Sequence, residues 1–169
     1  MNTADMLVDA FDRVQESVHH VVEGLDPTQL GARVGGDANS IAWLVWHLTR
    51  VQDDHVAEVA GTEQVWTARK WSERFGLPLP RLSTGYGHDS GDVAAVRVDS
   101  PDLLTGYYDE THERTIAYVR GLTDADLDRV VDHAWDPPVT LGVRLVSVVN
   151  DDTQHVGQAA FVRGVILAG

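Results

Sequence analysis

Apolar residues recur at intervals of three and four in four long segments of the chain, and polar residues fill the positions between them. This spacing is typical of helices that bury one face. Ser40 and Ser100 stand where N-cap side chains are expected, and Pro101 suits the first position of a helix. The pattern therefore predicts four long helices, over residues 3–24, 41–60, 101–121 and from about 140 to near the C-terminus.

Shorter helical signals lie between the long segments. Pro27 follows an aspartate cap and predicts a helical turn to Leu30, and Thr123 predicts another turn after the third long helix. A further short helix is expected over residues 66–75, anchored by aromatic side chains. Glycine and proline interrupt residues 76–99 every few positions, so this stretch is expected to be irregular or only locally structured. A connection of this length either carries function or crosses the length of the fold.

These elements predict an all-α protein. Four long helices, no convincing strand run, and one long connection between the second and third helices indicate a four-helix bundle with a crossover. The chain has 169 residues, enough for one domain with a substantial core and too few for two. We therefore expect residues 1–169 to form a single helical domain.

Composition excludes several classes of function. Cysteine is absent, which rules out disulfides, thiolate metal ligands and a cysteine nucleophile, so nitrogen and oxygen atoms must hold any metal. The net charge of −13 argues against nucleic-acid binding, which needs clustered basic residues. No apolar run approaches the roughly 18 residues of a membrane span, and no leader opens the chain, so we expect a cytoplasmic protein. Lys70 is the single lysine, a bias typical of a GC-rich genome.

Asp151 and His155 form the first candidate site. Residues four apart lie one above the other on a helix face, so this carboxylate and imidazole point the same way. Val148 and Ala159 extend the same stripe, which suggests that the face is turned inward. Such a pair offers two of the ligands of a metal site. The alternative is a helix whose Asp and His face solvent.

His47 is the candidate third ligand. It lies about seven residues into the second long helix, whereas Asp151 and His155 lie about eleven to fifteen residues into the fourth. If the two helices run antiparallel, these depths can meet at one level of a bundle. The alternative for His47 is a buried histidine that is hydrogen-bonded within the core. The geometry permits a metal site without establishing one.

Two runs of sequence resemble the DinB-like superfamily. Residues 40–48, SIAWLVWHL, resemble its first metal-histidine segment, and residues 151–158, DDTQHVGQ, resemble its closing signature His-x-x-x-His-x-Gly-Gln. Asp151 replaces the first histidine of that signature, as in the mycothiol-dependent maleylpyruvate isomerase branch, which uses an acidic residue there. The resemblance covers essentially the whole chain. It implies an up-down-down-up bundle with a long crossover and the metal ligands His47, Asp151 and His155.

The resemblance also implies a function. Superfamily members in actinobacteria include thiol S-transferases that use mycothiol, and the GC-rich composition fits an actinobacterial source. Three protein ligands with an open fourth position are typical of a catalytic zinc site, although nickel, iron or manganese also accept such ligands. A thiol in that position would be deprotonated for attack on an electrophile. Alternatives are a hydrolase that uses metal-bound water, or a non-catalytic stress protein that binds metal or a small molecule.

Four further residues carry expectations about the site. Asp54 is a candidate hydrogen-bond acceptor for a ligand imidazole, and Gln158 is a candidate hydrogen-bonding residue near the metal. Arg144 could bind an acidic group of cofactor or substrate. Each of these three also has the plainer interpretation of a surface or packing residue. His88 is expected to be exposed, and outward aromatic side chains could support a homodimer. The electrophilic substrate does not follow from the sequence.

Overall fold

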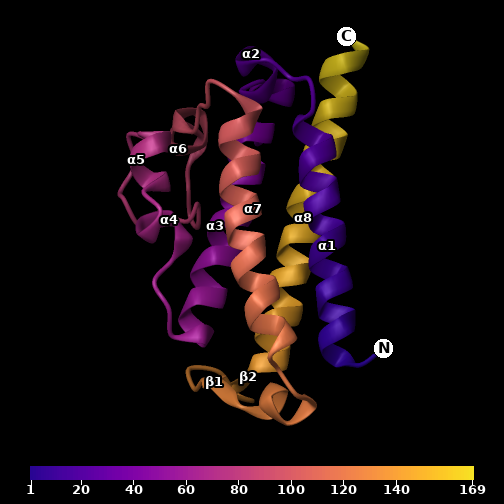
Figure 1. Ribbon diagram of the computed structural model, residues 1–169. Helices are drawn as coiled ribbons and strands as arrows, with labels where there is room; N and C mark the ends of the chain where they lie inside the picture. The colour runs from indigo at the N-terminus through magenta and orange to yellow at the C-terminus, as the bar shows by residue number, and fades with distance from the viewer.

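The computed structural model describes residues 1–169 and consists mainly of a bundle of four long helices (Figure 1). Viewed as in Figure 1, α1 runs up, α3 and α7 run down, and α8 runs up to the C-terminus. The all-α bundle with a crossover between the second and third long helices is therefore confirmed. The long helices are α1 (Thr3–Val22), α3 (Ile41–Ala60), α7 (Pro101–Arg120) and α8 (Leu141–Ala168).

Each long helix begins at a polar side chain that caps it. The side chains of Asn2, Ser40, Ser100 and Thr140 accept hydrogen bonds from main-chain N–H groups two or three residues further on. Gly61 ends α3 in the left-handed conformation, with φ of +68°, which costs a glycine little. Local sequence thus sets where these helices begin, and all four starting points agree with the prediction.

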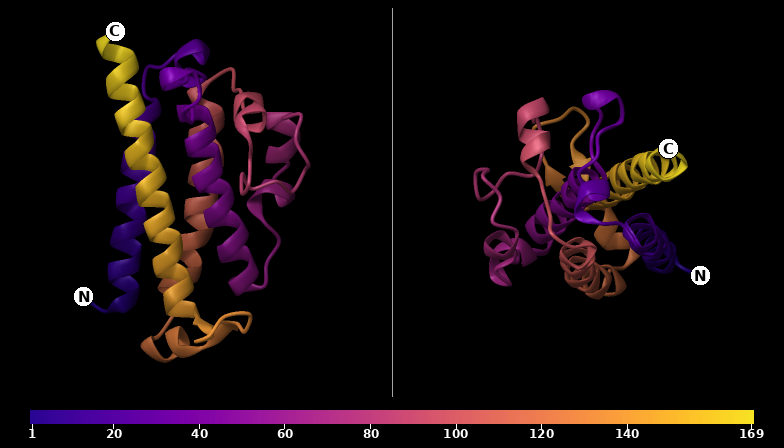
Figure 2. Two further views of the ribbon diagram at one scale, coloured as in Figure 1. Left: turned by 180° about the vertical axis from the view of Figure 1, so that it is seen from behind. Right: turned by 90° about the horizontal axis from the view of Figure 1, so that it is seen from above.

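The four helices form a ring in which each has two main neighbours (Figure 2). Helix α8 packs against α3 and α1, and α7 packs against the same two helices from the other side. Because α3 and α8 run in opposite directions, the middle of one helix faces the middle of the other. Apolar side chains fill the space between the helices, among them Leu44, Leu104 and Leu145, which are almost wholly buried.

The crossover from α3 to α7 covers one side of the bundle and contains three short helices (Figure 2). The aromatic anchors expected between residues 66 and 75 are buried. Asp53 of α3 accepts hydrogen bonds of 2.8 Å from the N–H groups of Val65 and Trp66, which attaches the crossover to the bundle. One of the three short helices lies inside residues 76–99, which were expected to be irregular or only locally structured. The three helices are α4 (Val65–Ala68), α5 (Trp71–Phe75) and α6 (Ser90–Ala95).

Arg50 of α3 holds the returning part of the crossover. Its side chain is completely buried, and Nε donates to the carbonyl oxygen of Ser83 at 3.1 Å. Nη1 donates to Gln64 Oε1 at 2.8 Å and contacts the Tyr107 hydroxyl at 3.2 Å. A buried guanidinium needs such partners to offset its lost hydration. These bonds place the chain around Ser83 directly over α3.

Between α7 and α8 lies a small hairpin that the sequence did not predict. Strands β1 (Val130–Asp132) and β2 (Val139–Thr140) pair antiparallel below the bundle (Figure 1). Strands of two and three residues are too short to show an alternating pattern. The remaining short elements are α2 (Pro27–Leu30) and the 3₁₀ helices η1 (Val34–Gly36) and η2 (Asp124–Asp128). No helix combines the length and apolar character that a bilayer span requires.

Candidate metal centre

His47, Asp151 and His155 converge between α3 and α8. Each side chain offers one ligand atom, and the three atoms all lie within 4.8 Å of one another. The imidazole rings of His47 and His155 have centroids 4.6 Å apart, with their planes at 77°. Because α3 and α8 run antiparallel, His47 lies at the same level of the bundle as Asp151 and His155, an arrangement that the sequence permitted. These three residues could therefore hold one metal ion.

The backbone of the crossover orients the ring of His47. Nδ1 lies 2.5 Å from the carbonyl oxygen of Thr84, and His47 is only 5% exposed. A carbonyl oxygen can only accept, so Nδ1 carries the proton and Nε2 keeps a free lone pair. Burial is the main cause that lowers the pKa of His47, which favours the neutral form. Neutral imidazole is the form that binds metals.

The ring of His155 is oriented in the same way by its own helix. Nδ1 lies 2.8 Å from the carbonyl oxygen of Asp151, one turn earlier, and so again leaves Nε2 free. Burial would lower the pKa of His155, but the nearby negative carboxylate of Asp151 and the hydrogen bond to the Asp151 carbonyl outweigh burial and raise it. Metal-binding histidines in proteins commonly donate their second N–H to a carbonyl oxygen or a carboxylate.

The carboxylate of Asp151 completes a donor set that suits a divalent cation. Oδ2 lies 3.2 Å from His155 Nδ1, but the proton on that nitrogen is directed at the main-chain carbonyl. Oδ2 is therefore buried without a hydrogen-bond partner. A buried carboxylate oxygen needs a partner. Two imidazole nitrogens and one carboxylate oxygen are ligands that zinc and similar metals accept, so the residues present fit a metal ion.

Trp43 and His88 brace the ring of His47. The indole of Trp43 stacks on the His47 imidazole, with centroids 4.5 Å apart and planes at 16°. Trp43 Nε1 donates to His88 Nδ1 at 3.1 Å, and His88 Nε2 lies 2.8 Å from the Ser83 hydroxyl. The prediction that His88 is exposed is wrong, since the crossover folds back and half buries it. The stack fixes the plane in which His47 offers its nitrogen.

Gly85 allows the crossover to approach His47 this closely. Its φ is +97°, which L side chains rarely adopt. A Cβ atom at this position would also overlap Nδ1 of His47 and press on Trp43. Only glycine therefore lets the Thr84 carbonyl reach the imidazole.

Two predicted supporting residues lie elsewhere. Asp54 Oδ1 accepts a 2.6 Å hydrogen bond from Gln64 Nε2, and Thr84 takes the imidazole proton that Asp54 was expected to accept. Asp54 lies seven residues beyond His47, roughly 10 Å along the helix, which is too far for this contact. Gln158 is exposed and lines a groove beside Phe161, between α8 and the segment around Val34. The contact predicted for Asp54 is therefore absent, and the role of Gln158 stays a prediction.

Arg144 lies next to the metal centre, but acidic residues already pair with it. Together with Asp151 it lines a cavity of about 320 Å³. Its Nη1 lies 2.7 Å from Glu58 and 3.0 Å from His55 Nδ1, and its Nη2 lies 3.3 Å from Asp132. Burial lowers the pKa of His55, and the charge of Arg144 lowers it further. The guanidinium is thus fixed in place at the wall of the cavity.

Two aromatic residues of this cavity were missed in the sequence. Tyr86 comes from the crossover and Trp135 from the turn of the hairpin, and both are largely exposed at 78% and 67%. The Tyr86 ring also meets His47 edge to face, with centroids 6.2 Å apart. The signal that could have identified these two residues is a large aromatic side chain within a glycine- or proline-rich loop. Their position over the centre depends on how both loops fold back.

The comparisons with known proteins cover nearly the whole chain. The family model described as the DinB superfamily matches residues 10–159. The structure is also similar to the crystal structure of a conserved protein from Enterococcus faecalis, with a TM-score of 0.93 and 27% sequence identity. That match covers 100% of this chain and 99% of the other. No curated protein matches the chain.

Proposed function

Because the chain belongs to the DinB superfamily, as the sequences of residues 40–48 and 151–158 indicated, we propose that it is a metal-dependent thiol S-transferase. In this proposal His47, Asp151 and His155 hold a divalent metal, with zinc the first candidate. A small-molecule thiol of the mycothiol type is the cofactor, and it attacks an electrophilic substrate. The observation that carries the proposal is that Asp151 belongs both to the ligand triad and to the wall of an open cavity.

The number of ligands favours a catalytic centre over a structural one. Structural zinc sites are closed by four protein ligands, whereas catalytic sites have three and keep a position for water or substrate. Here three side chains converge, and a cavity of about 320 Å³ lies beside one of them. When bound, a divalent metal would lower the pKa of a thiol or water in its open position.

The residues of the chain would bind and orient the two substrates. The protein has no cysteine, so the attacking sulfur must come from a small molecule. Tyr86 and Trp135 offer aromatic faces at the mouth of the cavity, suited to packing against a sugar or an apolar substrate. Arg144 offers hydrogen-bond donors from a fixed position, and its pairing with Glu58 and Asp132 leaves little charge for an anion.

A direct test incubates the metal-loaded protein with mycothiol and a panel of electrophiles and follows loss of free thiol. We expect metal-dependent consumption of thiol with at least one electrophile, and loss of that activity in His155→Ala. The matched control is His112→Ala, which removes a histidine of α7 outside the triad and should keep the activity. Hydrolysis of ester or amide substrates without thiol consumption would favour metal-bound water, and inactivity toward both would favour a binding protein.

A further inference from the structure

His55 lies on the same face of α3 as the metal ligand His47. Residues 47, 51 and 55 are four apart, so their side chains form one stripe along the helix. On α8, Arg144 and Asp151 are seven apart and form a stripe that faces it. Val51 and His55 line the cavity of about 320 Å³ together with these two residues. The metal centre therefore lies at one level of the α3–α8 contact, and His55 lies two turns away at another.

Arg144 determines which nitrogen of His55 carries the proton. Nη1 of Arg144 lies 3.0 Å from Nδ1 of His55, and a guanidinium can only donate. Nδ1 therefore accepts, and the proton of the ring is on Nε2. The same Nη1 donates to Glu58 Oε2 at 2.7 Å, and Nη2 lies 3.3 Å from Asp132 Oδ2. The guanidinium that selects the tautomer is thus held in place by two carboxylates.

The ring of His55 offers a hydrogen-bond donor without a positive charge. Burial is the main cause that lowers its pKa, and the charge of Arg144 lowers it further. The carboxylates of Asp54, Glu58 and Asp151 oppose this shift only in part. The contact with Arg144 is the one hydrogen bond of the ring. Nε2 is not among the buried polar atoms that lack a partner, because His55 is only half-buried at the wall of the cavity. Its N–H is therefore free for a ligand.

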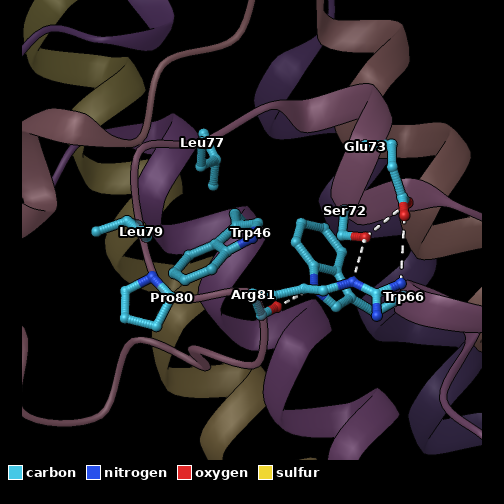
Figure 3. A pocket seen from close by; sticks show the side chains of 8 residues that line it. All are labelled: Trp46, Trp66, Ser72, Glu73, Leu77, Leu79, Pro80 and Arg81. Carbon is cyan, nitrogen blue, oxygen red and sulfur yellow. Dashed lines mark hydrogen bonds and ion pairs between the residues drawn. The ribbon is translucent and has the colours of Figure 1, made fainter.

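The cavity between α3 and the crossover offers no comparable donor (Figure 3). There, Arg81 Nη2 lies 3.2 Å from Glu73 Oε1, and the Ser72 hydroxyl donates to Glu73 Oε2 at 2.7 Å. Trp46 also borders this cavity, but the residue is 1% exposed and its Nε1 is fully buried. The cavity beside the metal centre thus has the free neutral donor that this one lacks.

We propose that the Nε2–H of His55 binds an uncharged oxygen acceptor of the electrophilic substrate, such as a ketone, amide or ether oxygen, and thereby selects this class of substrate. The inference rests on the proposed thiol transfer, because it assigns the substrate of that reaction. His47 and His55 are eight residues apart, roughly 12 Å along α3. The acceptor therefore belongs at the opposite end of the substrate from the carbon that the sulfur attacks.

The charges around His55 explain why the acceptor is uncharged. Glu58 and Asp132 together outweigh the single positive charge of Arg144, so a carboxylate of the substrate would meet net negative charge. A neutral oxygen avoids this repulsion and still accepts from the imidazole. Arg144 acts through His55 and is a positioning residue.

The test follows the imidazole nitrogen resonances of the full-length, zinc-loaded, ¹⁵N-labelled protein, with those of His55 assigned from their absence in His55→Gln. At pH 7 we expect the Nε2–H tautomer, and in Arg144→Met a mixture of both tautomers. The probes are 4-methylacetophenone and 4-ethyltoluene, which are similar in shape, and only the first has an acceptor oxygen. The ketone should shift the Nε2 signal saturably and bind roughly five- to tenfold tighter than the hydrocarbon.

Variants separate the donor from the shape of the side chain. In His55→Phe the ratio of the two affinities should fall to about one, whereas His55→Gln keeps an N–H donor and should retain a preference for the ketone. His20→Phe changes an exposed histidine of α1 and should leave the preference unchanged. The tautomer measurement and His55→Gln decide the matter even if His55→Phe unfolds.

The proposal is overturned if Nδ1 of His55 carries the proton at pH 7, if the ketone leaves the Nε2 signal unchanged, or if His55→Phe keeps the full preference. The outcome for thiol transfer is separate. If the expected binding results hold and no electrophile consumes thiol, thiol transfer is contradicted, and His55 is still shown to bind the acceptor oxygen in this cavity.

Discussion

Asp151 and Asp152 are neighbours in sequence, yet they lie in two polar regions with opposite properties. Asp151 belongs to the metal centre, where a main-chain carbonyl holds each of two imidazoles and one ligand atom of each residue lies within 4.8 Å of the others. Asp152 belongs to a second group of buried polar side chains, which we call the inner polar layer and define as Tyr108, His112 and Asp152. It is completely buried, and both of its carboxylate oxygens lack hydrogen-bond partners, as does the Tyr108 hydroxyl.

The two regions differ in the orientation of their polar groups as well as in burial. Burial raises the pKa of Asp152 and of Tyr108 well above the usual values, and the charge of Asp152 adds to the effect on Tyr108. Nothing in this layer directs lone pairs to a common point. In the metal centre, backbone contacts do so. A cluster of buried polar groups is therefore a candidate site when hydrogen bonds to the backbone orient its side chains toward one point.

The largest effect should come from removing a ligand of the metal centre. His155→Ala deletes one of three donors, and we expect metal affinity to fall by more than about 100-fold, because even loss of an outer contact costs roughly 10- to 100-fold. Elemental analysis and calorimetric titration of parent and variant measure the change. His112→Ala, in the inner polar layer, should bind about one metal per chain like the parent. Undiminished metal in His155→Ala would contradict the site.

Metal binding should survive one replacement of Asp151 and be weakened by another. Asp151→His keeps a ligand at the same helical spacing and should still bind metal, whereas Asp151→Ala should bind more weakly and lose most activity. An uncharged imidazole in place of the carboxylate leaves the centre more positive, so the group that reacts there should titrate at lower pH in Asp151→His. A pH–rate profile with metal analysis tests this. An unchanged profile, with full metal in Asp151→Ala, would exclude Asp151 as a ligand.

Gly85→Ala should damage the centre through the orientation of His47. The added Cβ overlaps Nδ1 of His47 and displaces the Thr84 carbonyl, so we expect a roughly 10- to 100-fold loss of metal affinity. Gly87→Ala is the matched control, because Gly87 also has a positive φ, of +71°, but no atom lies within 4 Å of the added Cβ. Equal metal affinities of the two variants would show that backbone strain, and not the contact with His47, decides the outcome.

Asp152→Leu should stabilise the protein. The carboxylate is completely buried without partners, and a leucine, whose side chain has the same number and branching of heavy atoms, removes the cost of burying it. We expect the free energy of unfolding to rise by about 1 to 3 kcal/mol, measured by urea denaturation of the metal-free protein. Metal stoichiometry should stay the same. A lower stability would mean that Asp152 has a partner in solution.

His112 should contribute the smallest effect, and one that depends on pH. Its pKa is lowered, chiefly by burial, although Asp12 lies 3.0 Å away and opposes the shift. The unfolded state therefore binds a proton more readily, and stability falls as pH drops below about 6.5 toward the lowered pKa. His112→Phe should reduce the loss of melting temperature between pH 7.5 and pH 5 by roughly 2 °C. Identical losses in parent and variant would contradict this.

The fold was largely predictable because its elements depend on neighbouring residues. Ser40, Ser100 and Thr140 mark helix starts through short-range caps. The hairpin at Val130–Asp132 was missed because its strands are stabilised by pairing and not by a local pattern. The predicted exposure of His88 was wrong for a related reason. The crossover half buries His88 through a contact with Trp43, which lies 45 residues away along the chain.

What the sequence alone determined is the four long helices and the shared face of Asp151 and His155. The spacing of these two residues places both side chains on one face of any α-helix, whereas their meeting with His47 requires that the two helices run antiparallel. Only the tertiary structure decided that Thr84 and Trp43 orient His47, that Asp54 accepts a hydrogen bond from Gln64 instead of a ligand imidazole, and that Trp135 lines the cavity. Helix geometry fixes contacts within a turn or two, whereas contacts between distant segments depend on the path of the crossover and hairpin and on the packing that holds them.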